Sequence, residues 1–328
     1  ESGTNTGDVQ RGHYSFATKT FTHNDSLEST DLWEVSEEDL DADPDFINAV
    51  RVVARRDQAP VASFFAGIFG FDSFNASAEA IAYIGFAGNL RPQDVDQPIA
   101  ICSEALRDGD SYTCSIGRMI NSGGSSETSN TGGWTSFNQV DPCQGGTNAS
   151  EMNGLICAGG NPESITLGQD IATNGGQIQS AFKSFYKCWE QHSQDKTQPW
   201  EITLPVIECS GNNVGTCERV VGAVNVTIIW INDKNDPNYT NAPEEMGNWP
   251  TSDDVVDYDL SDGEQRWTSF VEHFNLKNLS DDSQTGFEPA PYAQKSIYFL
   301  PDCEPHEPKG ATGGENFGIL AQIPVLVK

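Results

Sequence analysis

The sequence predicts an α+β fold: a mixed or antiparallel sheet with packed helices and a disulfide-rich loop region. This prediction rests on alternating apolar residues typical of strands, on apolar spacings typical of helices, and on eight cysteines gathered after the first hundred residues. The strands expected in the sheet are Val50–Arg55, Phe74–Phe86, Val220–Ile231 and Ile319–Val327. We divide the chain into a strand–helix–strand block (1–97), a cysteine-rich insertion (98–217) and a C-terminal part (218–328) that completes the same core.

The first block contains two strand patterns around one helix pattern. Residues 48–56 alternate, with Val50, Val52 and Ala54 on one face. Apolar spacing over Val61–Phe69 predicts a helix, and Pro60 suits its first turn. Alanine then alternates with polar residues from Ser73 onward. This alanine face could receive either a neighbouring subunit or the helix of the same chain. A further strand is expected near Tyr14–Phe21.

Five segments carry a resemblance to a known family. They are Asn48–Val52, Pro60–Ser73, the alanine-rich strand ending at Ala82, Gly12–Thr22 and Phe317–Lys328. Together they resemble the TadE/TadG-like proteins of Flp-type pilus assembly systems. The resemblance implies a bacterial surface protein associated with pili. Such proteins usually begin with a hydrophobic membrane helix. No apolar run of about twenty residues occurs here, so membrane contact is expected only through a segment that this sequence does not contain.

The charge of the chain restricts its partners. There are 48 acidic and 18 basic residues, giving a net charge of -30. This balance argues against binding to nucleic acid, whose phosphates would be repelled, and against charge-driven adhesion to anionic membranes. The ordinary interpretation is solubility, and cation binding is the sharper alternative.

The eight cysteines indicate disulfides rather than metal. They are Cys102, Cys114, Cys143, Cys157, Cys188, Cys209, Cys217 and Cys303. None forms a C-x-x-C pair and the histidines do not cluster near them, which argues against structural zinc. Four disulfides in an oxidising extracellular or cell-surface compartment are therefore expected. Eight cysteines allow roughly a hundred connectivities. Short separations favour Cys102–Cys114, Cys143–Cys157 and Cys209–Cys217, leaving Cys188–Cys303.

Two acidic segments are candidates for calcium, and no other cofactor is expected. The candidate ligands are Asp39, Asp41, Asp43 and Asp45 in the first segment and Asp233, Asn235 and Asp236 in the second. Carboxylate and amide oxygens are the ligands that calcium prefers. Asp39–Asp45 lacks the glycine and terminal glutamate of an EF-hand loop. A solvated acidic turn and a plain loop are the favoured interpretations.

The later segments add structure without catalytic signatures. Residues 175–189 have a helical apolar face, and Ser261–Glu264 reads as a capping box that opens another helix. Residues 219–231 are apolar on both faces, as in a central strand. Trp134 and Phe137 either fill a disulfide-rich core, the favoured interpretation, or form an exposed pair for a glycan. Cys209–Cys217 reads as a disulfide-closed turn.

Three function classes remain open. The favoured one is a non-catalytic extracellular structural or interaction protein, either a pilus-associated subunit or a surface adhesin, whose partners are other surface or pilus subunits or further copies of itself. A secreted enzyme acting on a glycan polymer is an alternative, although neither a phosphate-binding glycine loop nor a G-x-S-x-G elbow is present. A calcium- or glycan-binding module is the other alternative.

Overall fold

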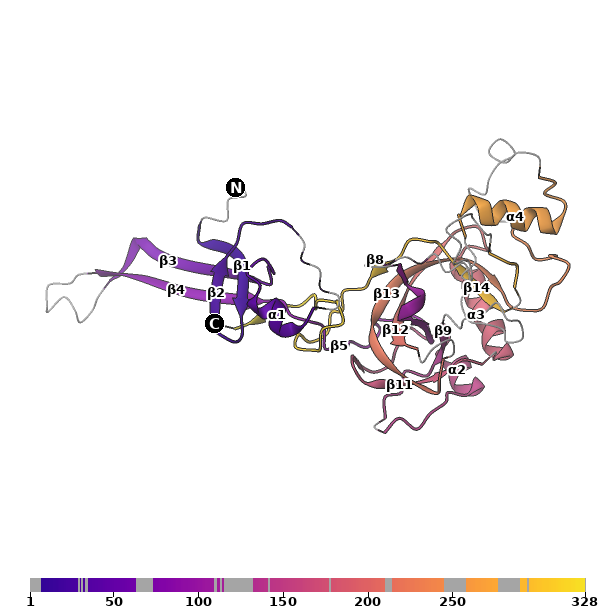
Figure 1. The fold of residues 1–328 in the computed structure, drawn as a ribbon, viewed down its shortest axis with the longest axis horizontal. Helices are drawn as coiled ribbons and strands as arrows, with labels where there is room; N and C mark the ends of the chain where they lie inside the picture. Colours follow the sequence, from indigo (N-terminus) through magenta and orange to yellow (C-terminus); the bar gives the residue numbers. More distant parts are fainter. Residues whose placement is uncertain are drawn as a thin grey trace. The chain divides into compact units, whose positions relative to one another are not determined.

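The computed structural model shows two compact units, Glu1–Gly88 with Gly310–Lys328 (the terminal unit) and Asn89–Lys309 (the inserted unit) (Figure 1). The structure describes residues 7–28, 30, 32, 35–62, 73–108, 111–112, 114, 132–140, 142–176, 178–209, 214–244, 258–276, 290–293 and 295–327. The chain therefore leaves the terminal unit once and returns to it for its last residues. These units differ from the predicted division at residues 97 and 217.

The terminal unit is built on a five-stranded antiparallel sheet in the order β16-β4-β3-β1-β2. Its elements are β1 (Val9–Ser15), β2 (Thr20–His23), α1 (Glu37–Ala42), β3 (Ala49–Ala62), β4 (Ser73–Tyr83) and β16 (Val325–Leu326). The single strand expected near Tyr14–Phe21 is instead a hairpin, because the chain turns between Ser15 and Thr20 and Lys19 has a φ of 54°. The expected last strand, Ile319–Val327, is mostly irregular and contributes only β16.

Strands β3 and β4 run together past the rest of the sheet (Figure 1). β1 pairs with β3 only over Ala49–Val52. The prediction of a helix starting at Val61 is wrong, because Val61 and Ala62 pair with Phe74 and Ser73 of β4 after a register shift. The rest of that predicted helix, residues 63–69, lies outside the described residues. A shift in register accommodates Pro60, which cannot donate to a ladder.

The inserted unit contains a second sheet that closes on itself. Its strands are β6 (Ile99–Cys102), β9 (Gly132–Thr135), β11 (Asp170–Asn174), β12 (Trp200–Glu208), β13 (Cys217–Asn232), β14 (Ser296–Phe299) and β15 (Glu304–Pro305). They follow the order β11-β9-β6-β12-β13-β14, and β11 also pairs with β13. Two short strand pairs accompany this sheet: β5 (Asn89–Leu90) with β10 (Ile165–Thr166), and β7 (Arg107–Asp108) with β8 (Ser111–Tyr112).

The long β13 strand corrects the prediction of one shared sheet. It is buried along almost its whole length, as expected of a central strand. All its partners, however, are strands of the inserted unit: β11, β12, β14 and β15. Residues 218–232 therefore complete the core of the cysteine-rich region and not that of the first block. The fold is sheet-rich, with four α-helices among the described residues.

Helices α2 (Ala149–Leu155), α3 (Gln179–His192) and α4 (Gly263–His273) belong to the inserted unit. The predicted apolar face of α3 is confirmed, with Phe182, Phe185 and Trp189 fully buried. Trp134 of β9 packs edge-on against Phe182, with ring centroids 5.3 Å apart. The core interpretation of Trp134 is thus confirmed. Helix α4 is capped by Asp262, one residue after the serine of the predicted capping box, because its carboxylate accepts hydrogen bonds from the first-turn N–H groups.

All eight cysteines form disulfides, but the predicted pairing is wrong. The bridges are Cys102–Cys209, Cys114–Cys303, Cys143–Cys217 and Cys157–Cys188. Cys102 is placed beside the end of β12 because β6 and β12 run parallel. Cys209–Cys217 is therefore not a disulfide-closed turn, since each of these cysteines pairs with an earlier segment. Every bridge lies within the inserted unit.

Candidate functional site

One face of the β3–β4 hairpin is largely apolar and partly exposed; Arg11 and Arg56 share this face, because they pair with Val50 and Ala76. The strand register places Val50 opposite Ala82, Val52 opposite Ala80 and Ala54 opposite Ala78. We call this face the β3–β4 surface: Val50, Val52, Ala54, Ala76, Ala78, Ala80 and Ala82. The side chains of Val50 and Val52 are 41% and 42% exposed. Val9, paired with Val52, and Leu326, paired with Ala82, extend it with exposures of 60% and 68%.

The opposite face of the same strands carries charged side chains along the hairpin and packs on a small buried cluster at Ile81. There the Arg51 guanidinium donates to the Glu79 carboxylate, at 2.9 Å from Nε, and Arg55 forms an ion pair with Asp8. An antiparallel sheet ordinarily turns its polar face to water and its apolar face to the core. Here Ala76 and Ala78 are exposed, so no described residue of the chain covers that end of the β3–β4 surface.

The outer edge of β4 is also available for pairing. Strand β16 pairs with β4 only at Tyr83 and Ala82, and the N–H of Val327 donates to the carbonyl of Ile81. Between Ala80 and Ser73, no described strand lies against this edge. An open strand edge of this length is a template for the strand of another chain.

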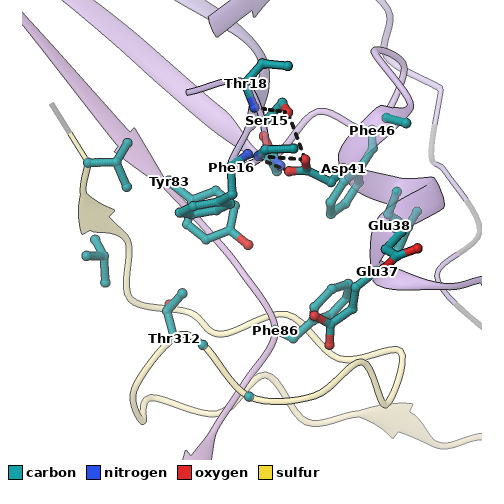
Figure 2. Close-up of a pocket in the computed structure, with 18 residues that line it drawn as sticks. Ser15, Phe16, Thr18, Glu37, Glu38, Asp41, Phe46, Tyr83, Phe86 and Thr312 are labelled. Carbon is teal, nitrogen blue, oxygen red and sulfur yellow. Dashed lines mark hydrogen bonds between the residues drawn. The ribbon is translucent and has the colours of Figure 1, made fainter. Parts of the chain in front are cut away.

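A cavity of about 810 Å³ lies at the other end of the sheet, within the terminal unit. We call it the Tyr83 cavity. Its walls come from the β1–β2 turn (residues 15–18), α1, Tyr83, Phe86, residues 312–314, Val325 and Val327. Figure 2 shows Phe16 and Tyr83 on one side, facing Phe46, Glu37 and Glu38 on the other. The volume falls within the range of small-ligand sites.

Aromatic rings form much of the cavity wall. Phe16 meets Tyr83 edge-on with centroids 4.6 Å apart, yet Phe16 remains 49% exposed. On the facing side Phe46 and Phe86 are stacked and buried. A Cβ at position 85 would overlap the Tyr83 ring, so the glycine at this position leaves room for the ring. The sequence offered no signal for this cavity, because its walls are more than two hundred residues apart in the chain.

Asp41 fixes the turn that carries Phe16. Its carboxylate accepts hydrogen bonds from Ser15 Oγ (2.8 Å) and from the N–H groups of Phe16 (2.6 Å) and Ala17 (3.1 Å) (Figure 2). The buried His13 ring lies 2.8 Å from the carbonyl oxygen of Asp41. Partial burial acts to raise the pKa of Asp41, but these hydrogen bonds outweigh it and hold the pKa below its ordinary value.

The acidic groups make the cavity electronegative. Burial, together with the nearby charges of Glu37 and Asp41, raises the pKa of the Tyr83 hydroxyl to about 12. Glu37 accepts a hydrogen bond from the N–H of Asn316 at 3.0 Å. The carboxylate of Glu38 is exposed and has no partner in the described part of the chain.

Most of the other predicted calcium ligands accept local hydrogen bonds; Asp233 is half-buried, and its backbone carbonyl accepts from Gln179. Asp39 accepts from Ser36, Asp43 from the N–H of Asp45, and Asp45 from Asn24. In the second set, Asp236 is buried and accepts from Thr240, from the N–H and side chain of Asn241, and from Tyr292, whereas Asn235 is exposed. Burial acts to raise the pKa of Asp236, and these hydrogen bonds lower it on balance.

Neither predicted set gathers three His, Cys, Asp or Glu ligand atoms among the described residues. The two groups that do are Cys157–Cys188–His192 and Cys102–Glu104–Cys209. Each contains a disulfide, whose sulfurs are not thiolates and so are poor metal ligands. Calcium therefore stays a prediction.

The inserted unit contains a second, more polar cavity of about 540 Å³. Its acidic residues are Asp96, Glu201, Asp302 and Glu304. The carboxylate of Asp96 accepts from the N–H of Thr203 at 2.6 Å. This cavity was not expected from the sequence, since acidic residues are spread over the whole chain.

Comparison with known proteins finds a match in the first part of the terminal unit. Residues 2–82 match the model of a family described as "Putative Tad-like Flp pilus-assembly". The match confirms the resemblance inferred from the sequence, and it covers most of the β3–β4 hairpin and part of the Tyr83 cavity wall. Neither a curated protein nor a solved structure matches the chain. In the described residues, none of the helices has both the length and the apolarity needed to cross a bilayer.

Proposed function

We propose that this protein is a non-catalytic, pilus-associated protein of the cell surface or extracellular space that works by binding neighbouring subunits. The observation that carries this proposal is the β3–β4 surface, an exposed apolar face beside an open strand edge. It lies largely within the region that matches the pilus-assembly family.

The chemistry of this surface suits assembly. A partner that covers the exposed valines removes them from water. This burial stabilises the complex by about 25 cal/mol per Å² of apolar area. Alanines let a neighbouring backbone approach closely, and the edge of β4 can add a strand by main-chain hydrogen bonds. Four disulfides support an oxidising exterior location.

Matched arginine substitutions on β4 test this proposal. Ala78→Arg places a charge on the β3–β4 surface, and Ser77→Arg places the same charge on the opposite face, one residue away; both positions are exposed. Binding of the purified variants to sheared pili from the source organism is measured. We expect Ala78→Arg to weaken binding by about tenfold or more, since burying an unpaired charge is costly, and Ser77→Arg to bind within about twofold of the unaltered chain.

Equal melting temperatures would show that both variants are folded. Equal binding by both would contradict the assigned surface. No binding of the unaltered chain to pili, together with binding to host or abiotic surfaces, would favour the adhesin alternative.

The acid-lined cavity of the inserted unit keeps a secreted enzyme as a second candidate. Paired carboxylates are the groups that hydrolyse glycosidic bonds. Turnover of a glycan polymer by the purified chain, lost in an Asp96→Asn/Glu201→Gln variant, would favour that function over assembly.

A further inference from the structure

The residues that line the Tyr83 cavity favour a positively charged ligand with an apolar part. Its apolar walls include Phe16, Phe46 and Phe86, and its charged side chains are Glu37, Glu38 and Asp41. The described residues that line it include no lysine, arginine or histidine. The buried His13 ring contacts the backbone carbonyl of Asp41 but is not among the residues that line the cavity.

The three carboxylates differ in how many hydrogen bonds they already accept within the chain. Asp41 already accepts three hydrogen bonds from the β1–β2 turn. Glu37 makes one hydrogen bond to the backbone of Asn316. Glu38 lines the cavity with none in the described part of the chain. The Tyr83 hydroxyl also lines the cavity without a hydrogen bond to a described residue. Glu37, Glu38 and the Tyr83 hydroxyl are therefore available to a ligand.

We propose that the Tyr83 cavity binds a primary ammonium group carried on an aliphatic stem. The stem lies along the rings of Phe16 and Tyr83 and the side chain of Val325, while the ammonium donates hydrogen bonds to Glu37, Glu38 and the Tyr83 hydroxyl. Ammonium groups are attracted to aromatic faces and to carboxylates, and their alkyl stems pack on apolar walls. An anionic ligand would be repelled by the same carboxylates.

This site is separate from the β3–β4 surface. Tyr83 lies next to Ala82 on β4 and therefore points to the opposite face of the sheet. A lysine side chain of a partner protein and a free alkylamine are two sources of the same chemistry. Failure of the assembly proposal would leave this one standing, and the reverse also holds.

The test uses the whole chain and three small probes. N-acetyl-lysine methylamide supplies the stem, the ammonium and flanking peptide groups; N-acetyl-norleucine methylamide lacks the charge; n-butylammonium lacks the peptide groups. Binding is followed by chemical-shift changes of the Gly313, Gly314 and Thr312 amides. We expect saturable binding of the lysine probe and none of the norleucine probe. Comparable binding of n-butylammonium would identify the source as a free amine, whereas a clear preference for the lysine probe would identify a peptide.

Variants assign the effect to the cavity. Glu37→Gln/Glu38→Gln keeps side-chain shape and the acceptor for Asn316, and is expected to weaken binding by about tenfold. Glu28→Gln removes an exposed charge elsewhere in the same unit and should change binding by less than about twofold. Tyr83→Phe should weaken it by a few-fold. Equal binding of the norleucine probe, no saturable binding to the folded chain, or equal effects of the Glu28 and Glu37/Glu38 variants would overturn the proposal.

Discussion

The two units of this protein differ in how much apolar surface they bury and in whether their strand edges are paired. The inserted unit closes its sheet by pairing β11 with β13, buries Trp134, Trp189 and Trp230, and contains all four disulfides. The terminal unit has an open sheet, no cysteine, and small clusters centred on Ile81 and Leu40.

Exposed apolar side chains follow the same division. Among the described residues, the large exposed apolar side chains in the terminal unit are Val9, Phe16, Leu27, Val50, Val52, Val325 and Leu326, against Val140 and Leu260 in the inserted unit. Exposed apolar patches are characteristic of interaction sites. The comparison teaches that stability is concentrated in the inserted unit, and apolar contact surface in the terminal unit.

Removing a disulfide should have the largest effect. In Cys102→Ala/Cys209→Ala the bridge over a separation of 107 residues is lost, which should cost about 4 kcal/mol of unfolding free energy. The comparison predicts that only the inserted unit is affected. Urea unfolding followed by the methyl signals of Ile231 and Ile81 reports on the two units separately. An equal loss at Ile81 would show that the units are one cooperative structure.

A matched pair of valine truncations gives the next largest difference. Val226→Ala removes a buried side chain of β13, and Val52→Ala removes a largely exposed one of β3. We expect a loss of about 2 kcal/mol in unfolding free energy for Val226→Ala and less than about 0.5 kcal/mol for Val52→Ala. Chemical denaturation measures both. A large loss for Val52→Ala would mean that the β3–β4 surface is covered within the chain.

How far the sequence could predict this structure depends on the range of the interactions. The α3 face and the β13 strand were predictable because 3.6-residue spacing and apolar runs are local signals. The bridge Cys102–Cys209 was not, because it follows from the parallel pairing of β6 and β12. The helix expected from Val61 failed at its start because pairing with Phe74 overrode the local spacing.

The candidate sites show the same limit. The alanine face could be predicted from the sequence. Its exposure could not, because it depends on whether another segment of the chain packs against it. The Tyr83 cavity could not be predicted at all, since Phe16, Glu37 and Thr312 come from three separate segments.

Acid should loosen the β1–β2 turn of the terminal unit. The pKa of Asp41 is lowered in the folded chain from an ordinary value of 3.8. Its contribution to stability is therefore fully present above that value and is lost as the pH falls through the folded pKa. Asp41→Asn should cost about 1 kcal/mol at pH 7 and flatten the pH dependence of unfolding below pH 4. Unfolding titrations of both chains followed at Ile81 measure this, and parallel curves would rule out a role for Asp41.

Calcium should produce the smallest effect. The carboxylates of Asp41 and Asp236 already accept several hydrogen bonds, so the exposed Asp39 and Asp45 and the half-buried Asp43 are left as ligands of the first set. Calcium would relieve the repulsion among these charges, and we expect millimolar calcium to raise the melting temperature of the terminal unit by about 2 °C. Asp43→Asn/Asp45→Asn should remove that rise, whereas Asp233→Asn, in the inserted unit, should not. An unchanged melting temperature in calcium and in chelator would leave the acidic run as a solvated turn.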